Sequence, residues 1–207
     1  QKNDTLKAKV DSYAVVEVTS PLYDALSEND KKIVGLFREV ADIMDGLFWK
    51  QTFGDKSLIE ALPEGPEKAY ALINYGAWDH LDNNAPFIKG YDQKPLGCQY
   101  YPQDMTVEEF EAFDDPNKLS LYTVIRRDEN GALKTVWYRD EYKEELEKVC
   151  ALLEEAAVKA HAGDQLADHL FALQQHGLHR IRLLLQRPGE GGLSAGQEHL
   201  PRLGGHR

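Results

Sequence analysis

The segment from Ile73 to Phe87 holds the densest set of side chains that could do chemistry. Asp79 precedes His80, and a carboxylate beside an imidazole can orient the ring for proton transfer. Neighbouring loop positions need not face each other, however, and no nucleophile stands nearby. Asp and Asn are also the usual turn formers. We therefore expect capping and turn roles for the polar residues of this segment, and we predict no catalytic residue in the chain.

Aromatic residues of the same region offer a second kind of site. Tyr75 and Trp78 could form a ledge for a sugar or a peptide, although packing in a core is the alternative for large aromatic side chains. The candidate substrate-binding residues are Tyr75, Trp78, Asp79, Asn83, Asn84 and Tyr101.

Charged residues elsewhere have simpler interpretations. The acidic cluster at 108–115 has mixed spacings on a short predicted helix, which is typical of a solvated face rather than of the paired carboxylates of glycosidases. Arg126 or Arg127 could hold a ligand carboxylate in a bidentate manner, but an internal partner such as Asp128 or Glu129 is the favoured alternative.

No metal site is predicted. Asp82 and the following asparagines lack the glycine and glutamate of a calcium-binding EF-hand loop. His176 and His179 are three residues apart with no glutamate between them, unlike the zinc-binding HExxH pattern. Cys98 and Cys150 lie far from any second ligand at a metal-binding spacing, so we expect two small buried or half-buried residues, or else one disulfide.

The elements that must position these residues are mostly helical. Apolar residues recur at helical spacing over 31–49 and 140–161, and shorter helices are expected at 56–62, 67–74 and 106–113. A β-hairpin is predicted at 121–138 around Asn130-Gly131. The stretch 75–101 reads as a long ordered loop rich in aromatic residues. The fold class is therefore α+β and mainly helical, with one β-hairpin.

Composition bounds the function and the domain organisation. A formal charge of −11 over 207 residues disfavours nucleic acid as a partner, and no apolar run is long enough to span a membrane. We expect a flexible N-terminal arm at 1–12 and a helical and hairpin domain at 13–160, whose first stretch, 13–18, is a strand or an extended arm. The polar opening and the absence of an initial Met would suit a removed signal or an upstream lipid anchor.

The composition changes abruptly after Lys159. Beyond this point the chain has no Lys, Tyr or Trp, and it holds six of the seven histidines. Residues 161–207 are therefore an atypical tail, either a genuine disordered extension or the product of a shift in the coding frame. Both interpretations stay open.

Four segments carry a resemblance to a known family. They are FGDK at 53–56, INYGAWD at 73–79, YPQDMT at 101–106 and SLYTVIRRD at 120–128. Together they resemble bacterial homologues of the dipeptidyl peptidase III family of zinc peptidases, over about residues 13–160. Some relatives have Nudix-hydrolase names, but this chain has no glutamate-rich Nudix box. The family pattern has a proline at Ala77 and an arginine at His80.

This resemblance implies the front part of a two-lobed zinc peptidase that removes dipeptides from peptide N-termini. In the family, zinc is held by a downstream HExxxH-type element and a later glutamate, so the resemblance implies zinc for the full-length protein, no ligands within this chain, and no activity alone. The polar opening, and not the resemblance, leads to the expectation of a periplasmic or cell-envelope lipoprotein. The first alternative is a secreted or periplasmic module that binds a glycan or peptide through the Tyr75–Tyr101 loop. The second is an interaction domain that docks a partner on the 140–160 helix.

Overall fold

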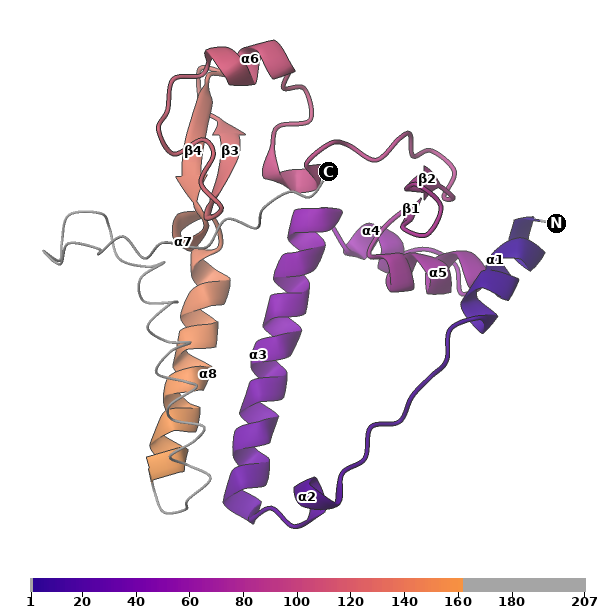
Figure 1. Ribbon diagram of the computed structural model, residues 1–207, viewed down its shortest axis with the longest axis vertical. Helices are drawn as coiled ribbons and strands as arrows, with labels where there is room; N and C mark the ends of the chain where they lie inside the picture. Colours follow the sequence, from indigo (N-terminus) through magenta and orange to yellow (C-terminus); the bar gives the residue numbers. More distant parts are fainter. Residues whose placement is uncertain (1, 162–207) are drawn as a thin grey trace, which may run out of the picture.

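Two long helices that lie side by side form the spine of the molecule (Figure 1). The computed structural model describes residues 2–161, and the predicted tail lies outside the described residues. Its elements are α1 (Lys2–Asp11), α2 (Pro21–Asp24), α3 (Glu28–Thr52), α4 (Ser57–Glu60), α5 (Pro66–Asn74), β1 (Trp78–Asp79), β2 (Ala85–Pro86), the 3-10 helix η1 (Cys98–Tyr100), α6 (Val107–Ala112), β3 (Thr123–Arg127), β4 (Leu133–Trp137), α7 (Tyr138–Glu141) and α8 (Lys143–His161).

Helices α3 and α8 run antiparallel. At one end the Asn29 side-chain amide donates to the Lys159 carbonyl at 3.0 Å, and at the other end Lys50 forms an ion pair with Glu145. Between these ends the apolar side chains pack in two clusters. The first joins Ile33 and Leu36 to Ala156 and Ala160; the second joins Leu47 to Tyr142 and Leu146. Burial of these apolar stripes drives the pairing.

The start of α3 is capped by a serine side chain. The Ser27 hydroxyl accepts a hydrogen bond from the Asp30 amide at 3.1 Å, which satisfies one of the free donors of the first turn. Thr106 does the same for α6, where it accepts from the Glu109 amide at 3.1 Å. Both helices, the long helix α8 and the mainly helical α+β class are as predicted.

Helices α4 and α5 fold against the end of α3 around an aromatic core. Trp49, Phe53 and Trp78 lie in this core, with Ile59, Ala71, Ala77 and Ile88. Gly76 adopts a φ of +147°, and a Cβ there would stand 2.8 Å from the Phe53 ring. A glycine is therefore required where the chain leaves α5 and enters β1.

The N-terminal segment differs from the expected flexible arm. Residues of this segment form α1, which packs on α5 and buries the side chain of Leu6. Lys2 pairs with Glu67 at 3.0 Å, and Lys9 pairs with Asp79. Ion pairs and one apolar residue hold the helix, so apolar periodicity, the signal used for the other helices, is missing here. The following stretch is extended, as predicted.

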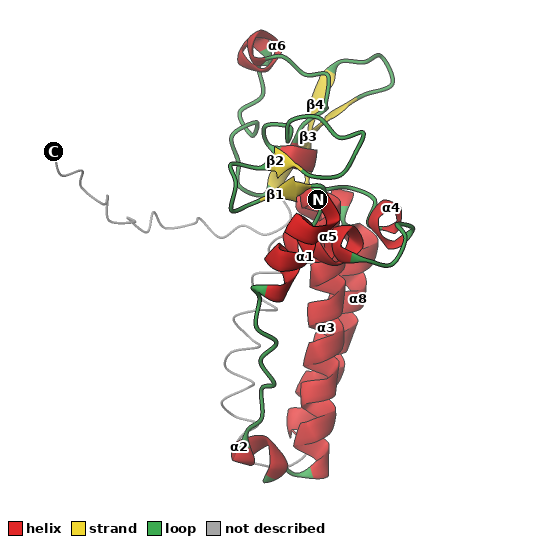
Figure 2. Cartoon of the chain, turned by 90° about the vertical axis from the view of Figure 1, so that its right-hand side faces the viewer, coloured by secondary structure: helices red, strands yellow, loops and turns green. Residues whose placement is uncertain are grey.

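The hairpin β3–β4 pairs Thr123 with Trp137 and Arg127 with Leu133. Its turn is closed by Asp128, whose Oδ1 accepts from the amides of Asn130 and Ala132 at 2.8 and 2.9 Å. The prediction of a single hairpin was wrong, because β1 and β2 form a second, two-residue antiparallel ladder inside the predicted loop. Figure 2 shows the two sheets at the same end of the helical spine.

A helix needs about 20 mostly apolar residues to cross a membrane. In residues 2–161, no helix combines the length and the apolar character needed to cross a bilayer.

Candidate functional site

Asn83 and Asn84 make the turn between β1 and β2. Both adopt left-handed backbone conformations, with φ of 50° and 57°, which asparagine tolerates better than most residues. The Asn84 amide donates to the Asp79 carbonyl at 2.9 Å, which closes the turn. These two candidate residues therefore have the turn role that the sequence allowed for them.

Asp79 is buried in a network of internal partners. Its Oδ2 pairs with Lys9, and its Oδ1 accepts from the Leu81 amide at 2.9 Å. Burial alone would raise the pKa of this carboxyl, but the hydrogen bonds from Lys9, Tyr70 and Leu81 hold it below its ordinary value. Burial and the bond to Asp79 raise the pKa of Tyr70 to about 12. The carboxylate thus stabilises a structure that joins α1 to β1.

Trp78 and Tyr75 contribute to the aromatic core. The Trp78 side chain is 6% exposed, and its Nε1 donates to the Asp92 carbonyl at 2.8 Å. Its ring packs against Phe53 and Tyr91, so it offers no open face to a ligand. The Tyr75 hydroxyl donates to Asp45 at 2.6 Å. The expected aromatic ledge is therefore covered by the protein itself.

His80 lies on the surface beside these residues. Its Nε2 is 3.1 Å from the Lys94 ammonium, and its backbone amide donates to the Asn74 side chain at 3.0 Å. Partial burial and the Lys94 charge lower the pKa of this imidazole. Asp79 is held by Lys9 instead of orienting His80, so the arrangement is not that of an acid–base pair.

Tyr101 is the candidate residue that lines open space. It borders a cleft of about 420 Å³ between the end of α3, η1, β3 and the end of α7. The cleft is lined by Lys50, Gly54, Gln99, Tyr101, Pro102, Gln103, Arg126, Glu141 and Tyr142. Tyr101 also borders two neighbouring hollows, of about 420 and 440 Å³. Its ring stacks edge-on against Phe110, with the centroids 5.7 Å apart.

Two ion pairs give this Tyr101 cleft its charge. Arg126 donates from Nε to Glu141 at 2.8 Å and from a terminal nitrogen to the Gln99 carbonyl at 3.0 Å. Lys50 pairs with Glu145 across the helical spine, and this pairing lowers the pKa of the Glu145 carboxyl. The walls therefore carry both signs of charge together with amide side chains, a lining suited to a polar, peptide-like ligand.

Arg127 has internal partners as well. It makes a bidentate contact with Glu109 at 2.7 and 2.9 Å, and its Nε donates to Asp104 at 2.9 Å. The prediction that an internal partner is favoured holds for both arginines, but the partners are Glu141, Glu109 and Asp104 instead of Asp128 or Glu129. One member of the acidic cluster, Glu109, therefore has a structural role.

The sequence did not indicate Lys50, Gln99 or Glu141 as parts of one cleft. They come from α3, η1 and α7, and the packing of η1 against both α3 and β3 brings them together. No motif spacing relates positions so far apart in the chain.

A metal site needs several His, Cys, Asp or Glu side chains close together. Within residues 2–161, no group of three His, Cys, Asp or Glu side chains lies close enough to hold a metal ion. The half-buried Cys98 and Cys150 thiols are not joined by a disulfide. The tail histidines, including His176 and His179, lie outside the described residues.

Comparison with known proteins identifies the fold. No family model matches the chain. Nudix hydrolase 3 of Arabidopsis thaliana is 25% identical over 51% of this chain and 18% of its own length. The structure of dipeptidyl peptidase III from Caldithrix abyssi superposes with a TM-score of 0.70, 30% identity, and coverage of 84% of this chain and 35% of that one. Dipeptidyl-peptidase III from Corallococcus sp. strain EGB superposes with a TM-score of 0.74 and 27% identity. The match covers 88% of this chain and 35% of that one.

The fold is thus one shared with peptidases. More particularly, it is a dipeptidyl peptidase III-like fold, as the four sequence segments predicted. The chain spans about a third of the length of these two solved structures.

Proposed function

We propose that this chain is the N-terminal portion of a dipeptidyl peptidase III-like zinc peptidase. The observation that carries the proposal is the superposition of 88% of this chain, at a TM-score of 0.74, on 35% of a dipeptidyl-peptidase III. In this proposal the chain is a scaffold, and the zinc ligands and the catalytic base are supplied by the remaining part of such a protein.

The Tyr101 cleft is the part of this scaffold that we assign to the peptide substrate. A peptide presents amide groups and two charged termini, and the cleft offers Arg126, Glu141 and the amide side chain of Gln103. The role of these residues is to bind and orient the peptide. A zinc ion bound elsewhere would polarise the scissile carbonyl and activate water.

A chimera tests the proposal directly. The part of the Caldithrix abyssi enzyme that superposes on this chain is replaced by residues 2–161, and the release of dipeptides from an unblocked peptide is measured by mass spectrometry. We expect release by the chimera and none by this chain alone. A folded chimera that binds zinc but releases no dipeptide would contradict the proposal.

Zinc analysis of this chain gives a second, independent test. We expect less than stoichiometric zinc in the purified chain. Stoichiometric zinc that is lost with His176→Ala or His179→Ala would show instead that the chain carries its own metal centre.

A further inference from the structure

Helix α3 carries two apolar seams. The first seam is Ile33, Leu36, Val40, Ile43 and Leu47, whose spacings alternate between three and four residues. This alternation is the heptad pattern of a helix that packs along another helix. Ile33, Leu36 and Leu47 pack against α8, so the first seam is occupied.

The second seam lies one residue further along, about 100° around the helix. It is Val34, Phe37, Ala41, Met44 and Phe48, with the same alternating spacing. Phe37 is partly buried against the cluster that joins α3 to α8, whereas Val34, Met44 and Phe48 are 38%, 46% and 45% exposed. Phe48 also touches the Tyr75 ring at one end of the seam. Apolar side chains grouped on an exposed helix face are typical of a surface that another element covers.

The extended arm, defined as residues 13–20, shows a matching exposure. Val15, Val16 and Val18 are 100%, 75% and 89% exposed. None of residues 14–19 forms a backbone hydrogen bond with another residue of the described chain. Exposed apolar side chains on an extended segment with unpaired backbone groups are typical of a surface that another segment covers.

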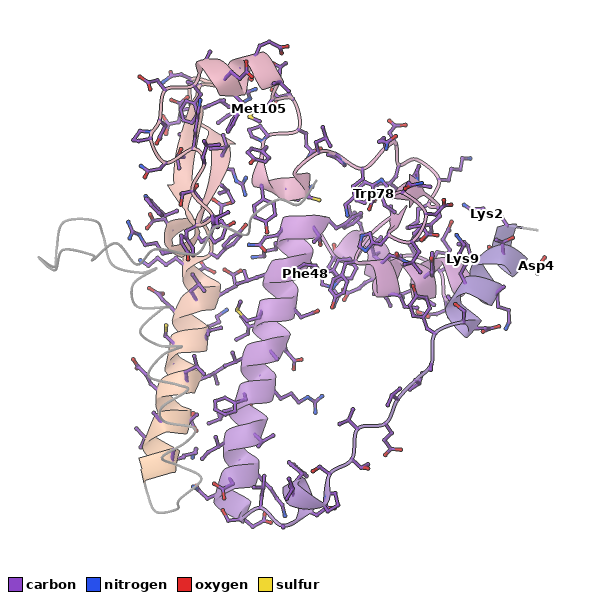
Figure 3. All side chains as sticks on the ribbon, viewed as in Figure 1. Lys2, Asp4, Lys9, Phe48, Trp78 and Met105 are labelled. Atoms are coloured by element: carbon purple, nitrogen blue, oxygen red, sulfur yellow. The ribbon has the colours of Figure 1, made fainter. Side chains whose placement is uncertain are left out.

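Helix α3 and the arm form two sides of an open frame. In Figure 1 the arm runs from α1 to α2 at a distance from α3, with α5 across one end. The side chains drawn in Figure 3 do not bridge the space between the arm and α3. Leu72 and Ile73 of α5 are also partly exposed.

We infer that the second seam and the arm together clasp an amphipathic helix from the part of a dipeptidyl peptidase III-like protein that lies outside this chain. The heptad spacing of the seam specifies a helix as the occupant. The source of the helix follows from the comparisons, in which nearly all of this fold accounts for only 35% of each solved structure. This inference rests on the proposed function.

Methionine oxidation tests the inference, because the chain has only two methionines, Met44 in the second seam and Met105 outside it. Peroxide oxidation of each is followed by mass spectrometry in this chain and in the chimera with the Caldithrix abyssi enzyme. We expect Met44 to react at least about tenfold more slowly in the chimera, and the Met105 rate to change much less.

Two substitutions in the chimera sharpen the test. Val16→Asp places a charge on the clasping face of the arm and should restore most of the Met44 reactivity. The control Val158→Asp lies at a 73% exposed site of α8 and should leave Met44 protected. Equal Met44 rates in the chain and the chimera, or an insoluble chimera beside a soluble parent enzyme, would overturn the inference.

Three further outcomes distinguish the clasp from a second copy of the chain and from the proposed function. Met44 protection in this chain alone that grows with protein concentration would identify a second copy as the occupant and overturn the inference. Met44 protection in a chimera that releases no dipeptide would support the clasp and contradict the proposed function. Dipeptide release by a chimera in which Met44 is not protected would support the proposed function and overturn the clasp.

Discussion

Lys9 of α1 forms an ion pair with Asp79, which lies 70 residues later at the entry to the β1–β2 turn. The Asp79 side chain is 3% exposed, whereas the Lys9 side chain is 37% exposed. The pair therefore has one buried member that depends on its partner, and it fixes the N-terminal helix to the aromatic core.

Lys9→Met should lower the free energy of unfolding by about 1–3 kcal/mol, because it leaves a buried carboxylate without its cation while keeping most of the side-chain stem. Urea unfolding measures this change. Lys7→Met is the matched control, since Lys7 pairs with the exposed Asp11 on the same helix and should change stability by less than about 1 kcal/mol. Equal effects of the two substitutions would contradict the assigned role of Lys9.

The stability that Asp79 supplies should depend on pH. Its pKa is lowered in the folded protein, so the ionised form stabilises the fold above the unfolded pKa of about 3.9. This contribution is lost as the pH falls through the lower, folded value. The difference in unfolding free energy between the wild type and Asp79→Asn should be large at pH 7 and shrink below about pH 4. A difference that stays constant down to pH 2 would show that the charge is not responsible.

Two glycine substitutions should act in opposite directions. Gly76→Ala places a Cβ 2.8 Å from Phe53 at a φ of +147° and should destabilise the protein by about 1–3 kcal/mol. Gly35→Ala lies within α3 with no atom near its new Cβ, and it should stabilise by about 0.5–1 kcal/mol. Thermal unfolding of both variants is the measurement. A neutral Gly76→Ala would mean that Phe53 can move aside.

Arg127→Lys should loosen α6 from the hairpin. Lysine cannot reproduce the bidentate contact with Glu109 while also reaching Asp104. The α6 amides should exchange with deuterium faster in the variant, and those of the α3–α8 pair should not change. Arg126→Lys is the comparison, because its carboxylate partner is Glu141 of α7 instead of α6. Unchanged α6 exchange in Arg127→Lys would rule out this role.

Tyr101→Ala in the chimera should raise KM for a peptide by about tenfold with a smaller change in kcat, since Tyr101 is assigned to binding and not to chemistry. Tyr101→Phe keeps the ring that packs against Phe110 and should have a smaller effect. An unchanged KM in Tyr101→Ala would remove the Tyr101 cleft from the proposed substrate site.

Apolar periodicity and turn residues predicted the parts of the fold that depend on local sequence. The apolar spacing of 31–49 predicted α3, and Asn130-Gly131 predicted the hairpin turn. Helix α1 could not be found in this way, because Lys9 and Lys2 hold it through partners 65 or more residues away. The β1–β2 ladder is only two residues long on each strand, too short for an alternation to show.

The candidate site was predicted less well than the fold. Asp79, Asn83 and Asn84 have the capping and turn roles that their residue types allow, and the structure places Trp78 in the core. Residue type does not show whether an aromatic ring is covered, because that depends on neighbours such as Phe53 and Tyr91. Of the six candidates, Tyr101 is the one that lines the cleft, and the charged residues around it come from other elements.

The contacts at both ends of the α3–α8 pair also limit how its sequence can change. Asn29 contacts Lys159, and Lys50 contacts Glu145. The length of α3 between Asn29 and Lys50 must therefore match the length of α8 between Glu145 and Lys159. An insertion of one residue would turn half of α3 by about 100° and move it by about 1.5 Å, so both end contacts could not form together. Substitutions at exposed positions of α3 are therefore tolerable where single-residue insertions and deletions are not.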